Sequence, residues 1–253
     1  MPKMFNAFEI RNETQTSADL YFYGDIVSDW YGAWAEEDQY PEAVKNFLSG
    51  QDGKSLNIYI NSGGGSVFAG IAIYNMIRRF AERNSVQVYV DGVAASIASV
   101  IAFAGSAPPK IPDNAFLMIH NPWALVNGNA EDLRKMADDL DVISGGILAV
   151  YMDHVKEGVT ESQIKDMMNA ETWLSGAEAS EYFDVETTGG VAEIAAAAGE
   201  YTARARNMPE SLRVEAAEKA EAHNQDARKA ELNEIKAKRE KIARAIINSR
   251  REI

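Results

Sequence analysis

A serine ends the run of small residues Gly92–Ala95, at a point where an expected strand turns into an expected helix. A hydroxyl at a helix N-terminus is most often only a cap, which accepts a backbone N–H from the first turn. The same position also suits a nucleophile, because the positive end of the helix dipole favours alkoxide character. On this second interpretation Ser96 attacks a substrate carbonyl, and the N–H of Ile97 is available to the oxyanion that forms. The residues alone leave both interpretations open.

The sequence offers one well-placed general base. Of its three histidines, His154 and His223 lie in expected helices among charged neighbours, which is typical of surface residues. His120 instead follows the apolar run Phe116–Ile119 directly, at the end of an expected strand. A neutral imidazole near pH 7 is a competent general base. A buried histidine that is bonded to backbone is the plainer alternative.

A glycine turn, Gly63–Gly65, and a carboxylate, Glu171, complete the candidate chemistry. Glycine lets backbone N–H groups approach a ligand closely, and a following helix adds partial positive charge, so the turn suits a phosphate, a carboxylate or an oxyanion. The spacing matches neither a P-loop nor a dinucleotide-binding GxGxxG motif. Glu171 precedes an apolar pair and could point inward to orient an imidazole. A tight turn and an ordinary surface carboxylate are the alternatives.

The elements that must position these residues alternate between strand and helix. We expect strands at 20–27, 56–60, 86–90 and 116–119, and helices at 41–48, 66–83, 96–104, 129–154, 160–169 and 175–182. Thr160 with Gln163, and Ser175 with Glu178, have the spacing of capping boxes. Alternation of this kind predicts an α/β fold with a parallel sheet and helical crossovers.

Composition divides the chain and excludes some chemistry. The 253 residues include no cysteine, which excludes disulfides, thiolate metal sites and a cysteine nucleophile and fits a reducing compartment. The net charge is −13, yet residues 201–253 hold 13 Lys and Arg against 9 Asp and Glu. An acidic body should repel nucleic acid. The basic tail is interpreted either as a solvated helical face or as a binding site for an anionic partner. We see no signal peptide or membrane span and expect a cytoplasmic protein.

Taken in order, the motifs resemble those of the ClpP-like serine peptidases (S14 type). The similarity covers about residues 18–190. Four segments carry it, namely the strand and glycine turn Ile60–Gly65, the nucleophile motif Gly92–Ser96, the histidine motif Met118–Pro122, and Trp173–Ala179, which is similar to the segment after the family's acidic triad member.

The resemblance implies an α/β fold of repeated ββα units, related to crotonase, with a handle at 126–155. It also implies peptide-bond hydrolysis through an acyl-enzyme, assembly into homo-oligomeric rings, polypeptide substrates, and no cofactor or metal. The resemblance implies that Ser96 is the nucleophile, His120 the base and Glu171 the carboxylate that orients the base. It also implies that the backbone N–H groups of Gly65 and Ile97 bind the oxyanion, and that Gly64 and Ser66 bind a substrate strand. The expected domains are a segment at 1–17, a peptidase domain at 18–190 and a charged helical tail at 191–253.

Several positions depart from the family's pattern. Glu171 stands where the family has aspartate, Gly63 where it has proline, Ser66 where it has valine, and Ala170 where the bacterial enzymes have an arginine that pairs across stacked rings. These departures, the acidic insertion at 29–40 and the tail resemble the ClpP-related head maturation proteases of tailed phages. That branch implies cleavage of scaffold and capsid proteins inside an assembling shell, with the tail as an assembly element open to self-cleavage.

Three other functions stay open. The first is a cellular Clp-type peptidase that works with an unfoldase. The second is an acyl-CoA hydratase or isomerase of the crotonase type, which would also use a glycine turn to bind an oxyanion. That function predicts no serine and histidine pair, so Ser96 and His120 argue against it. The third is a catalytically weak assembly or scaffold protein that keeps a peptidase fold.

Overall fold

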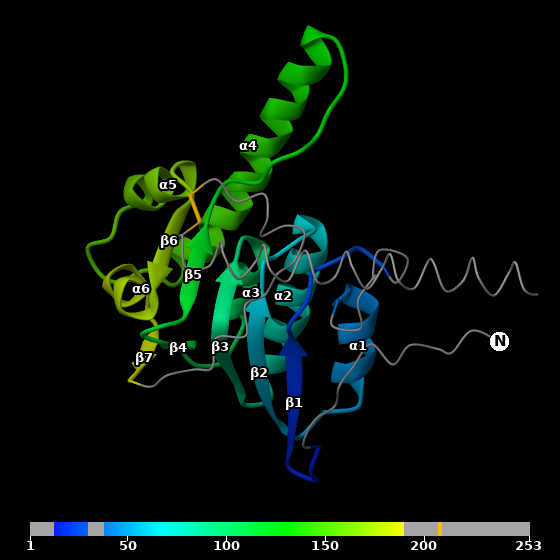
Figure 1. The fold of residues 1–253 in the computed structure, drawn as a ribbon. Coiled ribbons are helices and arrows are strands. Elements are labelled where there is room, and N and C mark those ends of the chain that lie inside the picture. Colours follow the sequence, from blue (N-terminus) through cyan, green and yellow to red (C-terminus); the bar gives the residue numbers. More distant parts are fainter. Residues whose placement is uncertain (1–12, 30–37, 190–206, 209–253) are drawn as a thin grey trace, which may run out of the picture.

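The computed structural model describes residues 13–29, 38–189 and 207–208. Within these ranges seven strands form one sheet, and six helices pack around it (Figure 1). The strands are β1 (Ser17–Phe22), β2 (Ser55–Ser62), β3 (Val86–Ala95), β4 (Lys110–Pro112), β5 (Phe116–Ile119), β6 (Thr172–Ser175) and β7 (Glu186–Thr188). The helices are α1 (Pro41–Ser49), α2 (Val67–Ala81), α3 (Ile97–Ala102), α4 (Ala130–Met152), α5 (Glu161–Asn169) and α6 (Gly176–Tyr182).

The sheet runs in the order β1-β2-β3-β4-β7, and β5 pairs with both β3 and β6. Every pairing is parallel except that of β5 with β6. The expectation of an α/β fold with a parallel sheet is therefore confirmed. Strand β3 has three partners: β2 pairs with it along most of its length, while β4 at Tyr89 and then β5 at Val93–Ala95 pair with its other edge. This change of partner brings the end of β3 beside β5.

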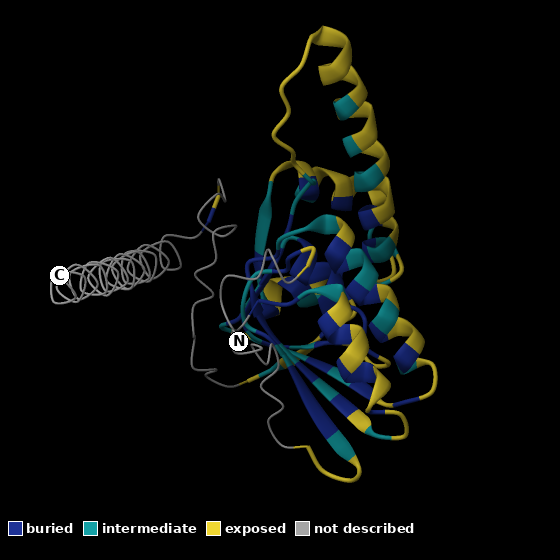
Figure 2. Cartoon of the chain, turned by 90° about the vertical axis from the view of Figure 1, so that its right-hand side faces the viewer, coloured by how far each residue is buried: buried dark blue, intermediate teal, exposed yellow. Residues whose placement is uncertain are grey.

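Helices α1, α2 and α3 cover one face of the sheet, where the core lies (Figure 2). Helix α2 buries Ile73, Ile77 and Phe80, spaced three or four residues apart as an amphipathic helix requires. Gly70 lets α2 approach α3 closely, since a Cβ there would lie 2.2 Å from Ile97 Cγ1. The start of α3, and the serine before it, are thus held against α2.

Helix α4 projects beyond the sheet, and its outer half is exposed in Figure 2. Its inner end is anchored by the buried Ile147, Leu148 and Tyr151. The helix lies within the segment at 126–155 that was expected to form a handle. No helix of the described ranges is long and apolar enough to cross a membrane.

Several expectations need correction. Strand β1 ends at Phe22 instead of reaching Val27, although Ile26 still makes isolated bridges to Gln39 and Gly65. The short strands β4, β6 and β7 were not expected. His154 is half-buried and stacks on Phe103 with ring centroids 5.0 Å apart, so its interpretation as a surface residue is wrong. The expected tail at 191–253, apart from residues 207–208, and most of the insertion at 29–40 lie outside the described residues.

Candidate active site

Ser96 stands alone between β3 and α3 in an unusual backbone conformation. Its φ is 55° and its ψ is −127°, in a region that costs a non-glycine residue about 1–3 kcal/mol. Its N–H donates to Met118 O at 3.0 Å, which ties the turn to β5. Among the described residues its side chain makes no capping bond to α3. The geometry thus departs from the simple cap that its position in the sequence suggested.

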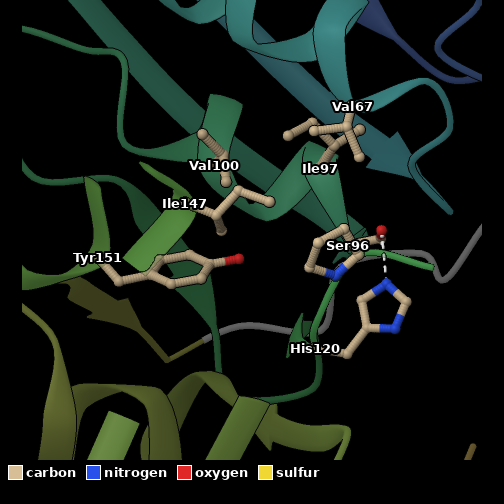
Figure 3. A pocket seen from close by; sticks show the side chains of 8 residues that line it. Val67, Ser96, Ile97, Val100, His120, Ile147 and Tyr151 are labelled. Carbon is tan, nitrogen blue, oxygen red and sulfur yellow. Dashed lines mark hydrogen bonds between the residues drawn. The ribbon is translucent and has the colours of Figure 1, made fainter. Parts of the chain in front are cut away.

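The hydroxyl of Ser96 instead faces the imidazole of His120 (Figure 3). Strands β3 and β5 are parallel, and Ala95 lies opposite Met118. Ser96 is the first residue after β3 and His120 the first after β5, so the two side chains lie at the same end of the strand pair. The distance from Ser96 Oγ to His120 Nε2 is 2.7 Å, within the range for direct proton transfer. Both residues are half-buried, which leaves them open to a substrate.

The glycine turn lies directly against this pair. A Cβ on Gly64 would come within 2.7 Å of Ala95 O and 2.8 Å of Ser96 Cβ. Gly65 has a φ of 148°, and a Cβ there would meet Ile26 O at 2.0 Å. Glycine is therefore required at both positions. Ile97 is the first residue of α3, where an N–H has no acceptor within the helix.

Two buried polar residues hold the turn in shape. Ser62 Oγ donates to Gly24 O at 2.7 Å and accepts from Gly64 N at 3.2 Å. Asn61 Oδ1 accepts from Val93 N at 3.2 Å, which links the turn to β3. Sequence reasoning gave Asn61 and Ser62 no role of their own. The available signal was a polar pair at the end of an apolar strand, immediately before the glycines.

The backbone of Gly64 and Ser66 already has partners. Gly64 O accepts from Ile26 N at 2.8 Å, and Ser66 N donates to Ile26 O at 2.7 Å. The Ser66 hydroxyl caps α2 by accepting from Ala69 N at 3.5 Å. A substrate strand that used these backbone groups would have to replace Ile26. The role of Gly64 and Ser66 in binding substrate therefore stays a prediction.

Glu171 lies opposite His120 when the pairing of β5 and β6 is continued by one residue. Strands β5 and β6 are antiparallel, and Ile119 pairs with Thr172, so the next pair outward is His120 and Glu171. Glu171 has a φ of 51°, in the left-handed region. Its Oε1 accepts from Asn207 N at 2.8 Å, and at 3.5 Å from Trp173 Nε1.

Within the described residues, the carboxylate of Glu171 is thus bonded to Asn207 and Trp173, and no hydrogen bond joins it to His120. The register brings Glu171 to the expected place, while the side chain is directed elsewhere. Its role as the orienting carboxylate stays a prediction.

A small pocket lies beside the pair (Figure 3). Tyr151 lines the pocket, and its hydroxyl lies 2.7 Å from the buried Ser99 hydroxyl. Burial raises the pKa of Tyr151 far above its usual value. An uncharged hydroxyl pair and apolar walls favour an uncharged ligand group. Sequence analysis missed both residues, although Tyr151 was visible on the apolar stripe of α4. The pocket is lined by Val67, Ser96, Ile97, Val100, His120, Pro122, Ile147 and Tyr151.

Several curated proteins similar to this chain are proteolytic subunits of Clp proteases. The chain is 32% identical over 132 residues to the ATP-dependent Clp protease proteolytic subunit of Bacteroides fragilis, a match that covers 51% of this chain and 61% of the relative. It is 34% identical over 137 residues to subunit 3 of Streptomyces coelicolor, covering 53% and 61%. The corresponding subunit of Porphyromonas gingivalis is 31% identical over 135 residues, covering 53% and 59%. The chain thus spans about three fifths of the length of these relatives.

The family model described as Clp protease matches residues 44–187, which is more than half of the 253-residue chain. The matched range contains the glycine turn, Ser96, His120 and Glu171. It also runs from α1 to β7 and so takes in all but the first strand of the sheet. The chain belongs to the Clp protease family.

Proposed function

We propose that this chain is a serine endopeptidase, which hydrolyses peptide bonds through an acyl-enzyme. The observation that carries the proposal is the 2.7 Å distance between Ser96 Oγ and His120 Nε2, at the end of two adjacent parallel strands. The relatives named as proteolytic subunits support it. The contact between these two side chains argues against the crotonase alternative, because that function does not require it.

In the proposed reaction, neutral His120 takes the hydroxyl proton as Ser96 attacks the peptide carbonyl. The carbonyl oxygen becomes an oxyanion, and the N–H groups of Gly65 and Ile97 stabilise it by about 3 kcal/mol each. His120 then gives the proton to the leaving amine, and the acyl group stays on Ser96. Water attacks the ester with His120 again acting as base, which restores the hydroxyl. Glu171 orients the imidazole and stabilises its charged form.

The pocket gives this reaction a substrate preference. A carbonyl beside Ser96 would direct the preceding side chain toward Val100, Ile147 and the neutral hydroxyl of Tyr151. Burying a charge there without a partner would be costly. We therefore expect cleavage after uncharged side chains.

Hydrolysis of a fluorogenic peptide library tests the proposal. Ser96→Ala and His120→Ala should each lower the rate by several orders of magnitude, and Glu171→Gln should lower it less. The matched control is Ser180→Ala, which removes a hydroxyl from α6, where it bonds to Ala177 O at 2.6 Å. Hydrolysis that survives Ser96→Ala at the level of this control would contradict the proposal.

We further propose that the chain works as a homo-oligomer, in a ring. Apolar side chains on and before α4 are exposed, with Leu125 at 88%, Val142 at 78% and Leu133 at 46%. A second copy of the chain would bury them. Native mass spectrometry should report a multiple of the monomer mass, and Val142→Asp should lower it. A monomer under native conditions would contradict this assembly.

A role in phage head maturation is a second candidate, which two adjacent positions favour. Glu171 and Ala170 are two of the departures from the cellular enzymes, and both contact Asn207 of the C-terminal region. On this proposal the substrates are scaffold and capsid proteins, and residues 191–253 form an assembly element. Purified protein should then cleave such proteins without an ATPase, whereas dependence on an unfoldase would favour the cellular role. If the tail is removed by self-cleavage, its loss should fail in Ser96→Ala.

A further inference from the structure

Two residues from the C-terminal region lie against the turn that carries Glu171. They are Asn207 and Met208, the short orange segment near α5 and β6 in Figure 1. Asn207 N donates to Glu171 Oε1 at 2.8 Å, and Asn207 Nδ2 donates to Ala170 O at 2.6 Å. Met208 is only 6% exposed. Two hydrogen bonds thus fix Asn207 to this turn, although it is 36 residues distant from Glu171 in sequence.

The turn has groups that need such a partner. Ala170 caps the C-terminus of α5, where the last carbonyls have no N–H donor within the helix. The amide of Asn207 supplies a donor to one of them. The Glu171 carboxylate accepts hydrogen bonds only, and the backbone N–H of Asn207 satisfies one of its oxygens. The contact therefore matches donor to acceptor at both positions.

This contact competes with the role proposed for Glu171. His120 is the residue opposite Glu171 in the continued register of β5 and β6. Yet within the described residues the carboxylate is bonded to Asn207, and at longer distance to Trp173, instead of to His120. An imidazole gains basicity and a fixed tautomer from a carboxylate only when the two are hydrogen-bonded. A Glu171 side chain held by Asn207 gives His120 less of this support.

We propose that Asn207 and Met208 form a latch, which holds Glu171 away from His120 and keeps Ser96 in a slow state. Release of the latch frees the carboxylate to turn toward the imidazole, and His120 then removes the Ser96 proton more readily. The proposal rests on the proposed peptidase function, and it adds an intramolecular control to it. A conformational change of this kind acts through the differential contacts that each state makes, and here both states use the same carboxylate.

The test measures how fast a fluorophosphonate acylates Ser96 in the full chain. Asn207→Ala removes the bond to Ala170 O, and Met208→Ser removes apolar burial without adding charge. Each should accelerate labelling, and together they should do so by about tenfold, a typical coupling between groups in contact. Met208→Leu is the matched control, because it keeps an apolar side chain of similar size, and it should label at the wild-type rate.

The same variants in a Glu171→Gln background show whether the effect passes through the carboxylate. The latch predicts that the acceleration disappears there. Wild-type or slower labelling of both Asn207→Ala and Met208→Ser would overturn the latch, and so would an acceleration that persists in Glu171→Gln. Failure of the peptidase proposal gives a different result, since Ser96 would then stay unlabelled in every variant.

Discussion

At the scale of single residues, Ser96 combines a strained backbone with a specific contact. A φ of 55° on a residue with a Cβ is uncommon, and such outliers persist where the surrounding structure enforces them. Here the bond from Ser96 N to Met118 O on one side, and Gly64 on the other, leave the residue little freedom. The strain presents the hydroxyl to His120. We regard it as part of the chemistry proposed for the site.

Gly65→Ala tests how closely the glycine turn must approach Ile26. The new Cβ would meet Ile26 O at 2.0 Å at a φ of 148°, so the turn must shift. We expect the free energy of unfolding to fall by about 1–3 kcal/mol from strain alone, and peptide hydrolysis to fall with it because an oxyanion donor moves. Urea denaturation and peptide hydrolysis provide the two measurements.

The control for this substitution is Gly53→Ala. Gly53 also has a positive φ, of 81°, but nothing lies within 4 Å of its Cβ position. Gly53→Ala should therefore lower the free energy of unfolding, because alanine is strained at this φ, while the rate of peptide hydrolysis stays near that of the wild type. Equal loss of hydrolysis in both variants would show that the turn at Gly65 has no special role.

The sequence predicted where Ser96 and His120 lie because each follows a strand, and adjacent strands bring such positions together. It could not predict the contact of Glu171 with Asn207, because the two residues are distant in sequence and no sequence pattern indicates which group a backbone amide will bond to. The prediction for Phe68 was wrong. This residue has the helical spacing of a core residue, yet it is 70% exposed on the first turn of α2.

At the scale of elements, the change of partner along β3 organises the site. The sequence was expected to end this strand near Gly92, because glycine in a strand pattern often marks a break. In the structure the strand continues through Gly92 to Ala95, and its last residues pair with β5. The strands β4, β6 and β7 span three or four residues each, too few for a period of two to be recognised. Longer elements with caps were predicted to within a few residues.

The two expected capping boxes are present, and that of α6 also supports β6. Ser175 Oγ accepts from Glu178 N at 3.3 Å, and Glu178 Oε2 accepts from Ser175 N at 2.8 Å. Ser175→Ala should lower the free energy of unfolding by about 1 kcal/mol, the usual cost of losing an N-cap. The check is urea denaturation beside Ser180→Ala, whose hydroxyl lies within the helix and caps nothing. Equal stability of the two variants would contradict the capping account.

At the scale of the whole molecule, the half-buried His154 couples stability to pH. Burial lowers the pKa of His154 below its usual value, and nearby Arg78 lowers it further, while Asp153 and Asp184 act in the opposite direction. The unfolded chain therefore binds a proton at this residue more readily than the folded protein does. By linkage the contribution of His154 is fully present above the unfolded pKa of about 6.5, and it is lost as the pH falls from there through the lower pKa of the folded protein.

His154→Phe should reduce this dependence on pH. Phenylalanine keeps an aromatic ring to stack on Phe103 but does not titrate. Between pH 7.5 and pH 5.5, the free energy of unfolding from urea denaturation should fall less in the variant than in the wild type. A fall of the same size in both proteins would show that His154 does not carry the coupling.

Acylation of Ser96 tests the central claim most directly. After exposure of the full chain to a fluorophosphonate, peptide mass mapping should place the adduct on Ser96, and the adduct should be absent from Ser96→Ala and strongly reduced in His120→Ala. Ser99, which lies deeper beside Tyr151, should stay unmodified. An unlabelled Ser96 in folded wild-type protein, or equal labelling in His120→Ala, would contradict a serine nucleophile activated by this histidine.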